Sequence, residues 1–283
     1  MNEFLKLTLS SLLATCSALC LFYIKLYYDR RQEKKNKKTE ADATIEYLCC
    51  MLNEIVLCVE QQLKIYDEYI TSLKRAPHAD HLLIVVVNGN LERLVKNFEH
   101  STLFHAYILK FGNDQKQIVN FHTMIGALEF MYSTNNKAID FTKQFREYFK
   151  QQKNDYFKFG YEGVQQEAIT LRSRIENDVK EYQNSSVYKV LNNTLEPYLK
   201  NASTAVSMQY IQEHLVMPLY LEISANHRSE NDLVLLRQNS ERATYIYNDM
   251  ILQTEGAIKH FKMFNKAFVT SVKALREAMD AMK

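Results

Sequence analysis

The sequence predicts an all-α protein, in which one N-terminal transmembrane helix is followed by an elongated bundle of long antiparallel helices. Three observations lead to this prediction. An uncharged apolar run lies near the N-terminus, apolar residues recur every three or four positions over most of the remaining chain, and only 6 glycines and 3 prolines occur in 283 residues. Because β-sandwiches and doubly wound sheets need many tight turns, so few turn residues argue against both.

The uncharged run covers residues 7–24, between Lys6 and Lys25. Its length meets the lower limit for a helix that crosses a hydrocarbon core about 30 Å thick. Three tyrosines in residues 23–28 are typical of a membrane interface. A cleaved signal peptide is the alternative, but no small-x-small cleavage site precedes the polar stretch. We therefore expect residues 1–28 to form an uncleaved transmembrane anchor.

Positive charge is concentrated directly after this run. Residues 25–38 hold seven basic and two acidic side chains, a local charge of +5 in a chain whose net charge is +2. Positive flanks stay on the cytoplasmic side of a membrane, which places the N-terminus outside a cell (inner) membrane and the rest of the chain in the cytoplasm. We expect residues 7–24 to contact the lipid bilayer, and residues 29–39 to form a basic juxtamembrane linker. The expected contacts of anionic lipid head groups are Lys25, Arg30, Arg31, Lys34, Lys35, Lys37 and Lys38.

The remaining residues, 40–283, are predicted to form one cytoplasmic helical-bundle domain. Residues 39–283 carry a net charge of −3. A nucleic-acid-binding protein is expected to spread positive charge over its folded face, so we expect no nucleic-acid partner. The cysteines are an odd, clustered set that is typical of a reducing compartment. A redox switch at Cys49 and Cys50 is a less favoured alternative.

The first helix of this domain has the clearest pattern in the chain. Its apolar residues are spaced by threes and fours, which places them on one face of a helix that ends before Pro77. They are Ile45, Leu48, Leu52, Ile55, Val59, Leu63, Tyr66, Ile70 and Leu73.

Residues 80–111 are predicted to form the return helix, with Asp80 as its N-cap. The β-branched residues in 82–87 leave a buried strand as the alternative, but no βαβ repeat or glycine-rich phosphate loop accompanies them. Gly112 is expected at a left-handed C-cap position, and Asp114 with Gln117 as a capping box for the next helix.

That next helix is predicted to end near Gly160, and another apolar stripe follows from Val164 to Tyr182. Pro197 is expected to interrupt the helix. A shorter helix over residues 198–225 is expected to kink at Pro218.

The last predicted helix reaches the C-terminus and is expected to be the longest. Its stripe runs from Ala243 to Met279 and includes Phe261, Phe264 and Phe268. So large an apolar face is not left in water on a soluble domain. We expect either the neighbouring helices or another chain to cover it, and the second case predicts a homo-oligomer or a complex with a protein partner.

No catalytic, cofactor-binding or metal-binding residue is predicted. The eight histidines lack paired zinc-ligand spacing and the Glu-x-x-His motif of di-metal bundles, and solvated positions at helix ends are expected for them. No Gly-x-Ser-x-Gly elbow occurs. We therefore expect no enzyme activity and no cofactor.

Two functions fit these predictions. The first is a single-pass membrane-anchored helical protein that acts as a protein-interaction or scaffold module on the cytoplasmic membrane face. The alternative is a membrane-acting effector or sensor, of the toxin, immunity or phage-exclusion type, that signals through its anchor. This alternative rests on analogy of architecture alone.

Overall fold

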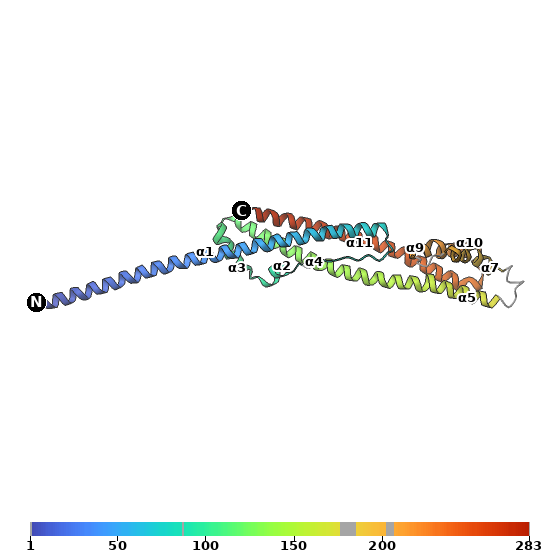
Figure 1. Cartoon of the computed structure of the whole chain (residues 1–283), viewed down its shortest axis with the longest axis horizontal. Helices are drawn as coiled ribbons and strands as arrows, with labels where there is room; N and C mark the ends of the chain where they lie inside the picture. The colour runs from blue at the N-terminus through green and yellow to red at the C-terminus, as the bar shows by residue number, and fades with distance from the viewer. Residues whose placement is uncertain (1, 87, 176–184, 202–206, 283) are drawn as a thin grey trace. The chain divides into compact units, whose positions relative to one another are not determined.

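The computed structural model describes the backbone of residues 2–86, 88–175, 185–201 and 207–282, and the side chains of 19–86, 88–173, 185–200 and 207–282. All regular secondary structure in these ranges is helical, which confirms the all-α prediction and the helical bundle (Figure 1). The α-helices are α1 Asn2–Arg75, α2 Gly89–Glu92, α3 His100–Phe111, α4 Gln115–Tyr156, α5 Val164–Ile175, α7 Ser186–Val190, α8 Glu196–Asn201, α9 Met208–Ile211, α10 Met217–Asn226 and α11 Val234–Asp280. Four π-helical turns are η1 Arg93–Asn97, η2 Phe157–Gly163, η3 Leu191–Leu195 and η4 Gln212–Val216, and η5 Asn231–Leu233 is a 3₁₀ turn.

The chain divides into two compact units. The first unit consists of Met1–Glu60, Val87–Tyr132 and Val269–Lys283, and the second of Gln61–Val86 and Ser133–Phe268. Helices α1, α4 and α11 contribute residues to both units. The domain boundaries predicted at residues 28 and 39 fall inside α1, so the basic linker is a helical segment.

The apolar stripe predicted on α1 is confirmed. Its residues from Ile45 to Val59 are all buried in the first unit, and Tyr66, Ile70 and Leu73 are buried in the second. Leu63 is half-buried. The helix ends at Arg75, two residues before Pro77, because proline disfavours the α conformation in the residue before it.

The predicted return helix is wrong over residues 80–86, and it is interrupted again at Phe98 and Glu99, whose backbone is extended. Residues 80–86 adopt no regular secondary structure, and helix α2 begins only at Gly89. The β-branched side chains of Ile84, Val85 and Val86 favour extended backbone. The strand alternative is wrong too, since no strand pairs with residues 82–86 in the described part of the chain.

A glutamine side chain supplies backbone hydrogen bonds that a neighbouring strand would otherwise make with this segment. Gln62 on α1 is buried, and its amide oxygen accepts a hydrogen bond from the Val86 backbone N–H at 2.5 Å. Its Nε2 donates to the Ile84 carbonyl at 3.3 Å. One side chain thereby satisfies two backbone groups of a half-buried segment that lacks a helical or strand partner for them. Asp80, the predicted N-cap, instead forms an ion pair with Lys153 of α4.

The turn between α3 and α4 largely follows the prediction. Gly112 ends α3 with φ +96°, and Asp114 caps α4 by accepting from the Gln117 backbone N–H at 2.9 Å. The backbone of Gly112 is nearly extended in ψ, at 170°, so it does not adopt the left-handed helical conformation. The capping box is half-formed, because the Gln117 side chain accepts a hydrogen bond from the Tyr107 hydroxyl.

The helix predicted to end near Gly160 does not end there. Helix α4 passes into the π-helical turn η2, which leads directly into α5. Gly160 is buried, and a Cβ atom at this position would lie 3.0 Å from the Cβ atom of Ala243 on α11 and 3.2 Å from the Cγ2 atom of Val216. This glycine is therefore required for close packing against α11.

Two successive segments of the second unit have the same order of elements: a serine N-cap, a short α-helix, a π-helical turn and a second α-helix. The sequence did not predict this arrangement. Ser185 caps α7, which continues through η3 into α8, and Ser207 caps α9, which continues through η4 into α10. Each serine hydroxyl accepts a hydrogen bond at 3.1 Å from the backbone N–H three residues later. Contacts of α10 with α7 and η3 show that the two segments pack together.

The two helix prolines occupy equivalent positions, near the start of the second α-helix of each segment. Pro197 and Pro218 each lie two residues after a π-helical turn. A proline lacks the N–H and clashes with the carbonyl four residues earlier, and a π-helical turn relieves both effects by shifting the hydrogen-bond register. The predicted interruption at Pro197 and kink at Pro218 are thus replaced by π-helical turns. The end of the predicted Val164–Tyr182 stripe, and the middle of the predicted 198–225 helix, lie outside the described residues.

Helix α11 carries its predicted stripe on a buried face. Phe261 and Phe268 are at most 1% exposed, whereas Phe264 is half-buried. The ring centroid of Phe261 lies 5.5 Å from that of Tyr66, 5.1 Å from that of Tyr69 and 5.5 Å from that of Phe141. Helices α1 and α4 therefore cover Phe261 within the second unit. The longest helix is α1, with 74 residues, and not α11, with 47.

The Gln62 bridge can be tested by substitution. Gln62→Leu preserves the size of the side chain but leaves the Val86 N–H and Ile84 carbonyl without a partner. We expect the free energy of unfolding to fall by about 1–3 kcal/mol, the cost of an unsatisfied buried polar group. Gln61→Leu is the matched control, because Gln61 is exposed. Chemical denaturation measures both variants, and equal stability of the two would contradict the bridge.

Candidate functional site

The first described side chains of α1 are almost all exposed. Every side chain from Leu19 to Glu40 is exposed except that of Leu26, which is half-buried, and Ala41 is the first buried residue. Five apolar or aromatic side chains between Leu19 and Ile24, together with Tyr27 and Tyr28, are between 51% and 68% exposed. An apolar surface of this kind on a bare helix is typical of a membrane or protein contact.

The basic side chains that follow lie on one side of the helix. At 100° per residue, Arg30, Arg31 and the four lysines between residues 34 and 38 fall within an arc of about 160°. Asp29, Glu33 and Glu40 lie outside that arc. All seven basic residues predicted to bind lipid head groups are exposed, and Lys37 forms an ion pair with Glu33 at 2.7 Å. The segment therefore presents a basic face and an acidic edge.

None of the helices searched within the described residues is both long enough and apolar enough to cross a bilayer. Most of the predicted anchor, residues 7–24, precedes Leu19 and so lies outside the described side chains. The helical backbone is described from Asn2 onward.

Helix α11 carries a second apolar row that the sequence analysis did not identify. Tyr245, Leu252 and Met263 are 72%, 63% and 61% exposed. Because they are separated by 7 and 11 residues, they lie within about 20° of one another around the helix. The buried residues Phe261 and Phe268 lie about 140–160° away from this outer row. The outer row is thus a solvent-facing apolar surface of the second unit.

The described cysteines and histidines were compared with the geometry of metal and redox sites. No group of three or more metal-ligating side chains occurs among the residues that were placed. Burial raises the pKa of the Cys49 thiol, which lowers its thiolate fraction and its reactivity. Cys50 is exposed, and Cys58 is half-buried.

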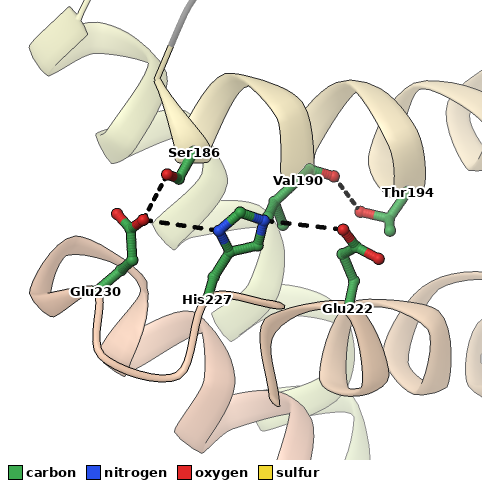
Figure 2. A network of polar contacts seen from close by, with 6 residues as sticks. All are labelled: Ser186, Val190, Thr194, Glu222, His227 and Glu230. Carbon is green, nitrogen blue, oxygen red and sulfur yellow. Dashed lines mark hydrogen bonds and ion pairs between the residues drawn. The ribbon is translucent and has the colours of Figure 1, made fainter. Parts of the chain in front are cut away.

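A polar cluster surrounds His227 at the end of α10 (Figure 2). Its Nδ1 lies 3.6 Å from Glu230 Oε1, and its Nε2 lies 3.8 Å from Glu222 Oε1. The Ser186 hydroxyl of α7 donates to the same Glu230 oxygen at 2.5 Å. The His227 side chain is only 14% exposed, so the expectation of solvated helix-end histidines fails here.

This cluster links the turn after α10 to the beginning of α7. It is not a nucleophile–base arrangement, because the Ser186 hydroxyl donates to a carboxylate and the imidazole has a carboxylate on each side. A protonated His227 would form ion pairs with both glutamates. The three residues 222, 227 and 230 match no recurring motif, so no sequence signal identified them.

A second histidine, His78, packs against Tyr247 of α11. Their ring centroids lie 5.5 Å apart in a stacked arrangement, and the Tyr247 hydroxyl lies 3.3 Å from His78 Nδ1. Burial lowers the pKa of His78, although the charge of Glu213 and a hydrogen bond that the imidazole donates to Gln209 act in the opposite direction. The folded protein therefore favours the neutral imidazole.

No protein-family model, curated protein or solved structure matches this chain. Its fold and surfaces are therefore the basis of any functional argument.

His78 predicts a pH dependence of stability. Since the folded state holds the His78 proton less tightly than the unfolded chain does, protonation below about pH 6.5 favours unfolding. We expect the free energy of unfolding to decrease as the pH falls from 7.5 to 5.5, and His78→Gln to make this decrease smaller. His105→Gln is the matched control, because His105 is exposed. Identical pH profiles of His78→Gln and the wild type would contradict the assignment.

Proposed function

We propose that the chain is a single-pass membrane-anchored protein whose helical units form a protein-interaction module on the cytoplasmic membrane face. One observation carries this proposal. A single unbroken helix, α1, contains the uncharged residues 7–24, the exposed basic segment 25–38 and the buried stripe of both units. In this proposal the helix α1 therefore contains the anchor, the basic segment and part of the core of both units.

The exposed side chains of residues 19–28 support an anchored location. Residues 7–24 supply the uncharged length for a transmembrane helix, and the interfacial tyrosines and basic residues follow in the order expected from bilayer to cytoplasm. In this proposal the basic residues nearest the bilayer attract anionic lipid head groups. That attraction decreases within a Debye length of about 8 Å, and Lys38 lies about 20 Å along the helix from Lys25.

The outer row on α11 supports the interaction role. Tyr245, Leu252 and Met263 extend over about 27 Å of helix at 1.5 Å per residue, and their side chains are mostly in solvent. Exposed aromatic and methionine side chains are enriched at protein interfaces. In this proposal a protein partner, or a second copy of the chain, covers the outer row.

The anchor can be tested by adding charge near its centre. Leu12→Arg with Leu13→Arg should release the full-length protein from membranes, because each arginine near the bilayer centre costs about 2.5–3.5 kcal/mol on insertion scales. Leu12→Ile with Leu13→Ile is the matched control and should stay in the membrane fraction. A reporter active only in the cytoplasm, fused after Lys283, should be active. If the Arg variant stays in the membrane fraction like the Ile variant, residues 7–24 are not the anchor. If a reporter fused after Lys283 is active only when exported, the predicted orientation is wrong.

The outer row can be tested separately in the intact, detergent-solubilised protein. Leu252→Glu with Met263→Glu should leave the melting temperature within a few degrees of the wild type, because neither side chain is packed. The same change should remove the protein that co-purifies with the wild type, or its self-association. Gln151→Glu with Gln166→Glu adds the same two negative charges at exposed positions on α4 and α5, away from the outer row, and is the control. Unchanged recovery of the partner with the Leu252/Met263 variant would show that the outer row is not the contact.

A further inference from the structure

The second unit contains a cavity of about 400 Å³ that none of the functions considered so far uses. Ligand pockets in proteins range from about 300 to 1,000 Å³, so this cavity has room for one small molecule. Its walls come from three segments of the unit: the end of α1, the extended residues 79–82, and residues 145–150 of α4.

Helix α4 presents two parallel rows of side chains to the cavity. Phe145 and Phe149 form an aromatic row, with ring centroids 5.8 Å apart, and Phe149 is buried. Arg146 and Lys150 form a cationic row one residue further along, and both side chains are exposed. Residues four apart lie on the same helix face, so each row is continuous. A ligand in the cavity would therefore meet aromatic carbon on one side and two positive charges on the other.

The α1 wall of the cavity is formed by buried side chains, and the wall from residues 79–82 is attached to α1. Tyr69 and Leu73 of α1 are 7% and 1% exposed. The His81 ring lies edge-on to Tyr69, with ring centroids 6.4 Å apart, and its Nε2 lies 2.7 Å from the Ala76 carbonyl oxygen. These contacts hold the extended segment over the cavity, so the site exists without a ligand.

The charge of the cavity is positive. Asp80, the acidic residue of its lining, already forms an ion pair with Lys153. Arg146 and Lys150 form no ion pair with any residue in the described part of the chain. Two unopposed cations beside an aromatic floor favour a ligand that is both anionic and flat.

We propose that this cavity is a binding site for a small aromatic anion, with its ring system against Phe145, Phe149 and Tyr69 and its anionic group between Arg146 and Lys150. Stacking on the aromatic side chains holds the ring, and the arginine and lysine hold the carboxylate, sulfonate or phosphate group. The proposed ligand must therefore carry both an aromatic ring and an anionic group. This proposal does not depend on the membrane anchor or on the outer row of α11.

The test uses 2-naphthalenesulfonate as the probe and the full-length protein in detergent. Calorimetric titration should show one site per chain in the wild type. Arg146→Gln with Lys150→Gln should weaken binding by about tenfold or more, as expected for the loss of two charge contacts worth about 1.4 kcal/mol together. Lys137→Gln with Lys262→Gln removes the same charge at exposed positions elsewhere and should leave the affinity unchanged. Comparing variants in the same detergent cancels any partition of the probe into micelles.

Two further probes separate the parts of the proposal. Inorganic sulfate, which has the charge without the ring, and 2-naphthalenemethanol, which has the ring without the charge, should each bind more weakly than the sulfonate. A phenylalanine at the cavity wall, Ala79→Phe, should block binding while the helical circular dichroism is retained. Equal affinity of the wild type and the Arg146/Lys150 variant for 2-naphthalenesulfonate would overturn the proposal, as would sulfate binding as tight as that of the sulfonate.

Discussion

The second unit depends on the burial of Phe261 between α1 and α4. Its ring contacts Tyr66 and Tyr69 of α1 and Phe141 of α4, so one side chain of α11 joins all three long helices. Edge-to-face and tilted ring pairs at these distances add about 0.5–1.5 kcal/mol each to the energy of burying the rings. The same face of α1 continues as Ile70 and Leu73 to the end of the helix, where the extended segment begins. The cavity wall formed by Tyr69 is therefore fixed by the core itself.

One polar network inside the second unit is satisfied by specific side chains, whereas the buried hydroxyls of Tyr66 and Tyr198 have no hydrogen-bond partner among the described residues. The Tyr156 hydroxyl lies 3.2 Å from Gln212 Oε1 and 3.3 Å from the Met208 carbonyl, and Gln212 Nε2 donates to the Thr244 hydroxyl at 3.2 Å. Gln212 and Tyr156 are both buried, and burial raises the pKa of the tyrosine. This network joins the π-helical turn η4 to α4 and α11.

The two apolar faces of α11 differ in burial. The buried face, with Phe261 and Phe268, packs inside the second unit, and the outer row, with Tyr245 and Leu252, faces solvent. A sequence stripe alone reports only that a helix has an apolar side. Which side meets α1 and α4 follows from the packing, because the face with more aromatic area gains more from burial. The row with less aromatic area then remains in solvent.

The sequence by itself determined the all-helical class, the buried stripe of α1, the end of α1 before Pro77 and the cap at Asp114, because these depend on local periodicity, capping and backbone restriction. It also defined the uncharged segment 7–24 and its basic flank. Only the tertiary structure decided that residues 80–86 are extended, since the Gln62 side chain that satisfies them lies some twenty residues away in the chain. Three further features likewise depend on which helix faces meet. They are the π-helical turns before Pro197 and Pro218, the close packing at Gly160, and the cavity beside the aromatic and cationic rows of α4. Local sequence fixes the periodicity of each helix, but not its partner.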